Sequence, residues 1–207
     1  TSPPRLTPKS LIEFASKPVW GLNYLFRGKF ELAQLKDHMR EGTNIAISVG
    51  DYFSSMLDQS MTWDDVADLQ RSWGGKFCLK GIMSADDARR AVEIGADAIM
   101  ISNHGGRQLD GGRSPFDQLE EIVQAVGGKI DIILDGGIRR GTHILKAIAL
   151  GATACSGGRM YLYALGAAGR LGVESALGNL RDEVERDMKL MGIRSLKELT
   201  PNMVRRR

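Results

Sequence analysis

The sequence predicts an α/β fold in which parallel strands alternate with helices. Three observations indicate this fold. From residue 61 onward, short apolar runs alternate with helical patterns, the runs are continuously apolar, and each of them ends in a polar or glycine-rich patch. Continuous apolar runs are typical of parallel strands that are covered on both faces. A repeat of roughly 25 to 35 residues per strand and helix implies right-handed crossovers.

The predicted elements of residues 61–207 follow one another in a regular order. Thr62 is a candidate N-cap for a helix over 63–73, and 76–81 is the first strand. Ser84 marks the start of the next helix, which Gly95 ends. The later elements are a strand over 96–102, a helix over 115–126, a strand over 131–137, a helix over 142–150, a strand over 152–158 and helical sequence to about residue 191.

Residues 1–60 have a different pattern and are predicted to form a separate loop or helical excursion. Thr7 and Pro8 have the residue types of an N-cap and first helical position, and a short helix is expected to run to Ser16. The segment 17–30 interleaves aromatic residues with lysine and arginine. No strand is assigned to the apolar run 45–50. The predicted division is therefore 1–60 and 61–207.

The composition is that of a soluble globular protein. The net charge of +3 over 207 residues does not favour binding to nucleic acid. Cys78 and Cys155 each lie in an apolar run, which indicates free, buried thiols in a reducing compartment. A disulfide between them is the alternative, but no secretory signal supports it. No apolar stretch is long enough to cross a bilayer, and no metal site is predicted.

Chemically active residue types gather at the ends of the predicted strands. In α/β folds, ligands bind at the carboxyl ends of parallel strands. Four such patches in succession indicate one shared site, whereas a single patch would indicate only a turn. The patches are Lys80-Gly81, Ser102-Asn103-His104, Asp135-Gly136-Gly137 and Gly157-Gly158-Arg159.

Two of the patches contain candidates for proton transfer and anion binding. His104 has the side chain best suited to act as a base near neutral pH, and Arg107 offers a planar fork for a carboxylate. The alternative for His104 is an ordinary loop residue. Lys80 ends an apolar strand and needs an anion or an electron-rich ring, and an ion pair with Asp135 is an equally good interpretation.

Two glycine turns have the pattern of a phosphate cradle. The first turn is Asp135-Gly-Gly-Ile-Arg139-Arg140-Gly141, which leads directly into a predicted helix. Gly158-Arg159 has the same combination of glycine and arginine after the next strand. Backbone N–H groups at a helix N-terminus, together with arginine, bind phosphate well. Either glycine pair alone usually indicates only a turn. His38 and His143 lack comparable neighbours in the sequence and are interpreted as surface or helix residues.

The stretch SNHGGRQLDG (102–111) resembles the signature of the FMN-dependent α-hydroxy-acid dehydrogenase and oxidase family. The resemblance extends through LKGI (79–82), DGGIRRG (135–141) and GGRMYLYAL (157–165), with matching spacing, over essentially the whole chain. Gly157 departs from it, because family members more often carry an aliphatic residue there. The resemblance implies a TIM (β/α)₈ barrel, of which this chain supplies roughly the C-terminal four βα units.

The resemblance also implies a role for each matching residue. His104 would take a proton from the substrate, Arg107 would hold the substrate carboxylate, and Lys80 would stabilise the reduced flavin. The implied FMN-binding residues are Lys80, Ser102, Asp135, Gly136, Gly137, Arg139, Gly158 and Arg159. The family's further catalytic groups, which include two tyrosines and the aspartate that orients the histidine, cannot be assigned in this sequence. A fragment of a longer protein is therefore expected.

The activity that the resemblance implies is oxidation of an L-2-hydroxy acid, with L-lactate as the expected substrate and a quinone or cytochrome as the electron acceptor. A glycolate or lactate oxidase and a mandelate dehydrogenase are alternatives, and a non-catalytic half-barrel that binds FMN or phosphate is a third. The segment 17–30 resembles the loop of membrane-associated members, which implies peripheral binding to the cytoplasmic face of a bacterial inner membrane. A lid over the active site or an oligomer contact is the alternative for this segment. A homo-oligomer is expected.

Overall fold

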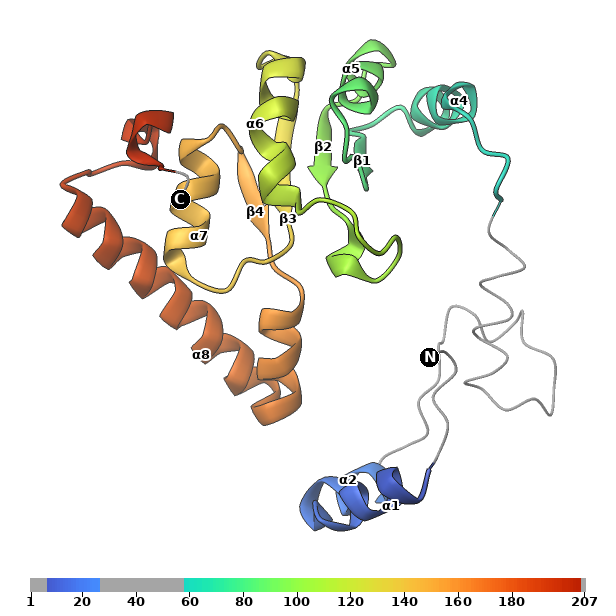
Figure 1. Cartoon of the computed structure of the whole chain (residues 1–207), viewed down its shortest axis with the longest axis vertical. Helices are drawn as coiled ribbons and strands as arrows, with labels where there is room; N and C mark the ends of the chain where they lie inside the picture. Colours follow the sequence, from blue (N-terminus) through green and yellow to red (C-terminus); the bar gives the residue numbers. More distant parts are fainter. Residues whose placement is uncertain (1–6, 27–57, 206–207) are drawn as a thin grey trace. The chain divides into compact units, whose positions relative to one another are not determined.

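The computed structural model describes residues 7–26 and 58–205 (Figure 1). The chain divides into two compact units, Thr1–Met61 and Thr62–Arg207. Each unit is described by itself. The run 45–50 and His38 lie outside the described residues, as do residues 27–30 of the segment 17–30.

The first unit contains two short helices, α1 (Pro8–Ala15) and α2 (Pro18–Phe26). The predicted start of α1 is confirmed, because the Thr7 hydroxyl accepts a hydrogen bond from the Ser10 amide at 3.2 Å and the Ser10 hydroxyl accepts one from the Thr7 amide. This reciprocal capping box satisfies two amide groups that a helix N-terminus would otherwise leave unpaired. The rings of Phe14 and Trp20 stack with their centroids 5.3 Å apart, which joins the two helices.

The second unit is a four-stranded parallel sheet with helices between the strands. The strands lie in chain order, β1-β2-β3-β4, so each crossover joins neighbouring strands. The strands are β1 (Cys78–Lys80), β2 (Ala98–Ile101), β3 (Asp131–Asp135) and β4 (Ala154–Ser156). The helices are α4 (Trp63–Trp73), α5 (Ala85–Glu93), α6 (Pro115–Val126), α7 (Gly141–Ala149) and α8 (Arg159–Met191), followed by the 3₁₀ turns η3 (Leu196–Glu198) and η4 (Pro201–Met203).

This order confirms the predicted alternation of strands and helices. The Ser84 hydroxyl accepts a hydrogen bond from the Asp87 amide at 3.1 Å and so caps α5 as predicted. The strands are shorter than predicted. Gly81 and Gly136 lie just outside the strands, where their positive φ angles turn the chain, although the Gly81 amide still donates to the Met100 carbonyl at 3.0 Å.

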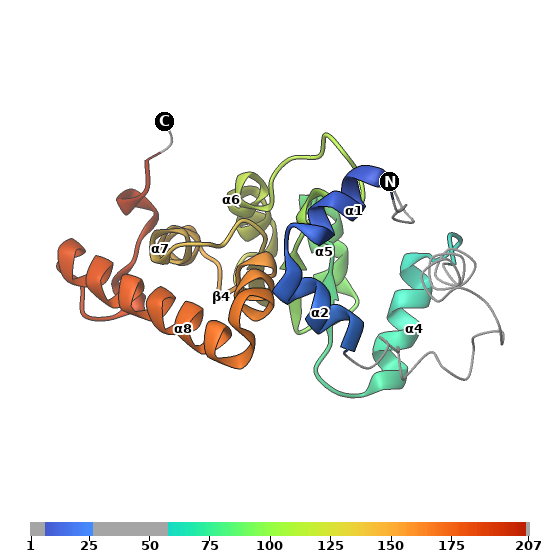
Figure 2. The ribbon, with the colours of Figure 1, turned by 90° about the horizontal axis from the view of Figure 1, so that it is seen from below.

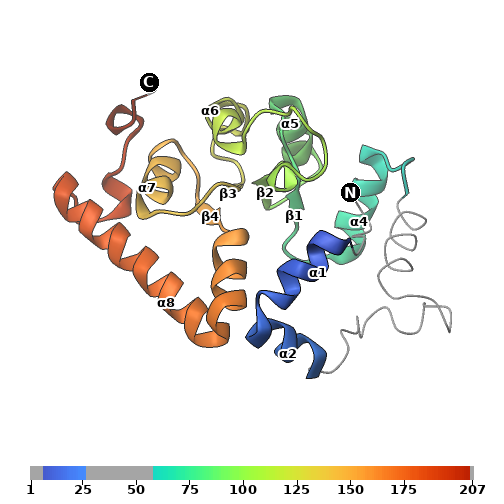
Figure 3. The same cartoon turned by 60° about the horizontal axis from the view of Figure 1, so that its bottom comes forward.

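The hydrophobic core lies on one face of the sheet. Ile99, Ile101 and Leu134 are fully buried, and they pack with Leu119 and Ile122 of α6. Helices α5, α6 and α7 stand in a row along this face (Figure 3). Full burial of each such side chain contributes about 1.5 to 3 kcal/mol to folding, so this layer supplies the main stabilisation of the sheet.

The opposite face of the sheet carries the alternate side chains, and we call it the open face. Cys78, Lys80 and Ala154 are exposed there, and Met100 and Ile133 are half-buried. Within the described part of the chain, helices cover only one face of the sheet, as a half-barrel would leave it. Both cysteines are free thiols, as predicted. The prediction that they are buried fails for Cys78, which is exposed on the open face, while Cys155 is half-buried.

Helix α8 bends and then packs along α7. The bend lies at Ala168 and Gly169, whose backbone angles are not helical. In Figure 2, α7 lies between α6 and the second part of α8. The Glu183 carboxylate of α8 accepts hydrogen bonds from the Gly141 amide at 2.8 Å and from Arg140 Nε at 2.8 Å, so α8 fixes the start of α7.

Candidate active site

Three predicted site residues meet at the carboxyl ends of adjacent strands. Lys80 of β1, Ser102 just after β2 and Asp135 of β3 all project toward the open face, because side chains alternate along a strand. Lys80 Nζ donates to Ser102 Oγ at 2.9 Å, and Ser102 Oγ donates to Asp135 Oδ2 at 2.6 Å. Lys80 Nζ also lies 3.3 Å from Asp135 Oδ2. The ion pair considered from the sequence is therefore present.

The Asp135 carboxylate is stabilised in its charged form. Burial alone would raise the pKa of this carboxyl group, but hydrogen bonds from Ser102, Ser156 and Lys80, together with the Lys80 charge, outweigh burial. The pKa of Asp135 consequently lies below its ordinary value. Lys80 keeps about half of its side chain exposed, with a relative accessibility of 47%, so its ammonium group can contact a ligand on the open face as well.

His104 lies directly beside this cluster. It begins the short 3₁₀ turn η2 (His104–Gly106) with a positive φ of 56°, which is unusual for a residue other than glycine. Its backbone amide donates to Ser102 Oγ at 3.2 Å. A Cβ atom at Gly81 would lie 3.3 Å from Cε1 of the His104 ring. The sequence reasoning missed this role of Gly81, which gives the imidazole room against the end of β1.

Arg107 follows η2 and is exposed. Within the described ranges 7–26 and 58–205, its guanidinium makes no hydrogen bond or ion pair, so its donors are available to an anion. The preceding turn is fixed, because the Asn103 side chain accepts a hydrogen bond from the Gly106 amide at 3.2 Å. Asn103 is a second residue that sequence reasoning left without a role.

The two glycine turns leave open space next to exposed arginines. No atom lies within 4 Å of a Cβ built on Gly137 or Gly158, and Arg139 and Arg159 are exposed beside them. Arg159 Nη2 donates to the Gly105 carbonyl at 2.7 Å, which ties this arginine to the His104 turn. Open glycine backbone with two guanidinium groups fits a phosphate group.

A cavity of about 470 Å³ adjoins these turns, and we call it the turn cavity. Gly105, Gly137 and Arg159 line it together with His143 and Lys146 of α7. His143 is a helix residue, as interpreted from the sequence, but its Nδ1 atom contacts the Gly137 carbonyl and the Arg139 amide, which the sequence pattern did not indicate. The separation of four residues between Arg139 and His143, across the start of a helix, is the signal that could have indicated their contact.

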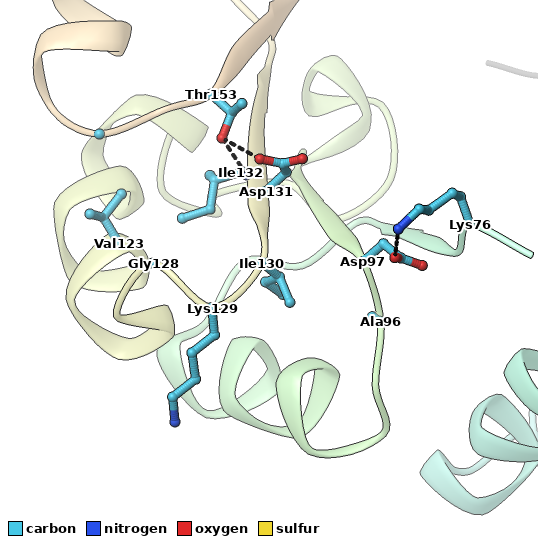
Figure 4. A pocket seen from close by; sticks show the side chains of 11 residues that line it. Lys76, Ala96, Asp97, Val123, Gly128, Lys129, Ile130, Asp131, Ile132 and Thr153 are labelled. Atoms are coloured by element: carbon cyan, nitrogen blue, oxygen red, sulfur yellow. Dashed lines mark hydrogen bonds and ion pairs between the residues drawn. The ribbon is translucent and has the colours of Figure 1, made fainter. Parts of the chain in front are cut away.

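A second cavity, of about 420 Å³, lies at the opposite, amino ends of the strands (Figure 4). Its polar groups are paired with one another: Lys76 Nζ contacts Asp97 at 2.5 Å, and the Thr153 hydroxyl donates to Asp131 at 3.1 Å. Lys129 points away from the Lys76–Asp97 pair. None of the predicted site residues lines this cavity.

Comparison with known proteins identifies the family of the chain. The family model of FMN-dependent dehydrogenases matches residues 1–206. An L-lactate dehydrogenase of Pseudomonas syringae is 36% identical over 204 residues, which cover 98% of this chain and 53% of that protein. An L-lactate oxidase of a Nostoc species is 47% identical over 163 residues, covering 76% of this chain and 45% of that protein.

A solved structure shows the same arrangement. The crystal structure of a monotopic membrane protein, (S)-mandelate dehydrogenase, superimposes with a TM-score of 0.88 at 33% identity, over 100% of this chain and 54% of that one. The chain thus spans about half the length of the relatives it matches. The family's fold is an α/β barrel, of which the described strands are four consecutive units. The chain belongs to the family of FMN-dependent dehydrogenases, whose cofactor is FMN.

Proposed function

We propose that this protein oxidises an L-2-hydroxy acid with FMN as cofactor, and that L-lactate is its substrate. The observation that carries the proposal is the Lys80–Ser102–Asp135 cluster with the His104 ring beside it at the carboxyl ends of adjacent strands. Relatives named L-lactate dehydrogenase and L-lactate oxidase support lactate as the substrate.

His104 and Arg107 have separate roles toward the substrate. His104 removes a proton from the hydroxy acid, and its position is fixed by the bond from its amide to Ser102. Arg107 binds the substrate carboxylate with its free guanidinium, which also orients the reacting carbon. FMN, when bound, accepts the two electrons of the substrate.

The remaining predicted residues hold the cofactor. Lys80 lies on the open face, where its charge would stabilise a reduced flavin, and Ser102 and Asp135 hold its ammonium group in place. We assign the ribityl chain to Asp135 and Ser102. The phosphate group is assigned to the backbone of Gly136, Gly137 and Gly158 and to the side chains of Arg139 and Arg159, where the glycines leave room for it.

The decisive experiment is lactate turnover by the complete protein with His104→Gln. Glutamine keeps a similar size but cannot act as a base near neutral pH, so turnover should fall by about 10²- to 10⁴-fold. FMN binding, measured by quenching of flavin fluorescence, should remain, which separates loss of the base from loss of the fold. Undiminished turnover would contradict the assignment of His104.

A mandelate-type dehydrogenase is the second candidate, because the structure of an (S)-mandelate dehydrogenase superimposes over the whole chain. Initial rates with lactate, glycolate and mandelate distinguish these substrates. Peroxide formed under air distinguishes an oxidase from a dehydrogenase that passes electrons to a quinone or cytochrome. A protein that stays colourless when FMN is supplied would favour a non-catalytic half-barrel instead.

We also propose that the first unit binds the surface of a membrane. Helices α1 and α2 expose Ile12, Val19 and Phe26, with relative accessibilities of 71%, 74% and 84%, and Lys9 and Lys17 flank this apolar surface. Apolar side chains beside cations suit an interface with anionic headgroups. Within the described ranges, no helix is both long and apolar enough to span a bilayer. The monotopic neighbour supports peripheral binding, for which the cytoplasmic face of a bacterial inner membrane is our proposed location.

Co-sedimentation with vesicles tests this second proposal. The complete protein should sediment with vesicles that contain anionic phospholipid, and a Val19→Ser/Phe26→Ser double variant should sediment less. Lactate turnover with a soluble electron acceptor should be the same for both proteins. Equal sedimentation of the two proteins would contradict a role of this surface in membrane binding.

A further inference from the structure

His143 contacts the backbone of the turn to which the cofactor phosphate is assigned, and the inference below rests on that assignment. The residue lies in the first turn of α7 and is half-buried. Its Nδ1 atom is 3.0 Å from the Gly137 carbonyl oxygen and 3.3 Å from the Arg139 amide nitrogen. One ring nitrogen thus faces both an acceptor and a donor of the same turn.

These two contacts need opposite states of Nδ1. A carbonyl oxygen only accepts, so a bond to Gly137 requires a proton on Nδ1. A backbone amide only donates, so a bond from Arg139 requires a free lone pair on the same atom. The neutral ring makes one contact or the other according to its tautomer, whereas the doubly protonated ring can only donate from Nδ1 to the Gly137 carbonyl.

A protonated ring also changes what the turn presents to a ligand. With Nδ1–H bonded to Gly137, the Arg139 amide is released and can donate to an anion. The ring then carries a positive charge, and its second nitrogen, Nε2, carries a proton as well. Both changes favour a phosphate group at the turn.

The charged groups around His143 explain why protonation would depend on the ligand. Lys146 of α7 and Arg159 at the start of α8 line the same cavity, and Arg139 lies on the turn itself. The Glu183 carboxylate of α8 is bound by Arg140 and by the Gly141 amide. Helix α6 and its N-cap contribute Ser114, Pro115 and Phe116 to the lining, none of which is charged. The cations repel a further positive charge, whereas a bound phosphate attracts one.

We propose that His143 is a positioning residue that takes up a proton when the phosphate of FMN binds, and so holds the 137–139 turn in its phosphate-binding form. FMN affinity then acquires a dependence on pH in the range of about 5 to 8, in which histidine side chains change charge. Protonation and phosphate binding favour each other, so this contribution is strongest at low pH and fades as pH rises.

Flavin binding to the complete protein, freed of cofactor, tests the proposal. Dissociation constants for FMN and for riboflavin are measured by fluorescence quenching for the wild type and for His143→Asn and His143→Gln. The ratio of the two constants isolates the phosphate, and riboflavin binding reports that each variant is folded. Comparison of wild type with variant cancels the ionisation of the phosphate itself. At about pH 6 the wild type should prefer FMN over riboflavin by roughly tenfold more than either variant, and this excess should disappear near pH 8.

Lys146→Gln is the matched control, since it removes a cation from the same cavity without a contact to the turn. A lysine keeps its charge throughout this range, so this variant should lower the preference for FMN by the same factor at every pH. The preference for FMN over riboflavin is compared between the wild type and the His143 variants. If the difference between them does not change with pH, the proposal is overturned. It is also overturned if Lys146→Gln loses the pH dependence of the wild type. Equal binding of FMN and riboflavin by the wild type overturns the phosphate assignment itself, which separates the two failures.

Discussion

Ser102 is the centre of the hydrogen-bonded cluster, with only 1% of its surface exposed. Its oxygen accepts from Lys80 Nζ and from the His104 amide and donates to Asp135. A hydroxyl group can serve in both directions at once, whereas a methyl group could serve in neither. The positions of the cation, the carboxylate and the candidate base are therefore coupled through one side chain.

Asp135→Asn should weaken the fold near neutral pH and change its response to acid. The pKa of Asp135 is lowered in the folded state, so the charged carboxylate stabilises the fold above its unfolded pKa of about 3.9. That stabilisation is lost as pH falls through the lower folded pKa. Urea unfolding between about pH 3 and 7 should show a loss on the order of 1 to 2 kcal/mol at neutral pH and a shallower decline in acid. A variant with the wild-type pH profile would contradict this role.

Gly81→Ala should reduce turnover by displacing the His104 ring. Gly81 has a φ of +95°, and an added Cβ would lie 3.3 Å from Cε1 of His104. Gly74→Ala is the matched control, because Gly74 also has a positive φ, of +63°, but no atom lies within 4 Å of its Cβ position. Both variants should lose about 1 kcal/mol of stability from backbone strain, but only Gly81→Ala should lose lactate turnover. Equal turnover would show that the ring does not depend on the space at Gly81.

The residues of the cluster could be predicted because each of them ends an apolar run, and parallel strands bring such ends together. Lys80, Ser102 and Asp135 were identified in this way. Gly81 and His143 were not, since their roles depend on which atoms approach them across a turn. A single sequence does not show which atoms approach each other across a turn, although the spacing of Arg139 and His143 is compatible with their contact.

At the scale of elements, the start of α7 is locked by α8. The Gly141 amide donates to Glu183, and the backbone of α8 passes so close that a Cβ at Gly141 would lie 2.7 Å from the Val184 nitrogen. The Arg140 guanidinium contributes most to lowering the pKa of the Glu183 carboxyl, and the Gly141 amide adds to this. The 137–139 turn, to which we assign the phosphate, thus has a rigid end on the α7 side.

Gly141→Ala should therefore separate α7 from α8. The side chain has no space, and relief of the clash would cost about 1 to 3 kcal/mol of unfolding free energy. Gly178→Ala, inside α8, has no atom within 4 Å of the new Cβ and should instead stabilise the helix by up to about 1 kcal/mol. The urea midpoints of the two variants should move in opposite directions. A shift in the same direction would show that the contact at Gly141 relaxes freely.

The alternation of elements was predictable, because caps such as Ser84 and stops such as Gly95 mark helix ends independently of tertiary contacts. The ends of the strands were less predictable than those of the helices. Gly81 and Gly136 continue the predicted strands in sequence, but in the structure they already belong to turns. The ladder ends where neighbouring strands no longer pair, and that depends on both partners.

At the scale of the whole second unit, the sheet is covered on one face and open on the other. Apolar runs alone do not reveal this, because Met100 and Ile133 are as apolar as Ile99 and Leu134. Only the placement of α5, α6 and α7 decides which of them is buried. Exposed residues at the start of α8, including Tyr163 at 74%, add apolar surface outside the core.

The two free cysteines should report the asymmetry of the sheet. Cys78 is exposed on the open face, whereas Cys155 is half-buried. Burial raises the pKa of both thiols, that of Cys155 to about 11, so little of the Cys155 thiolate is present at pH 8. In the 207-residue chain, a thiol reagent should modify Cys78 first, and Cys155→Ser and Cys78→Ser variants identify each phase. Faster modification of Cys155 would contradict an open face.

Strand order equal to chain order has a consequence for synthesis on the ribosome. Each new strand pairs with the one made just before it, and the cluster of Lys80, Ser102 and Asp135 needs only residues up to the end of β3. The nascent chain can therefore assemble the polar centre before α7 and α8 emerge. Helices α7 and α8 then add to a sheet whose first three strands are already paired.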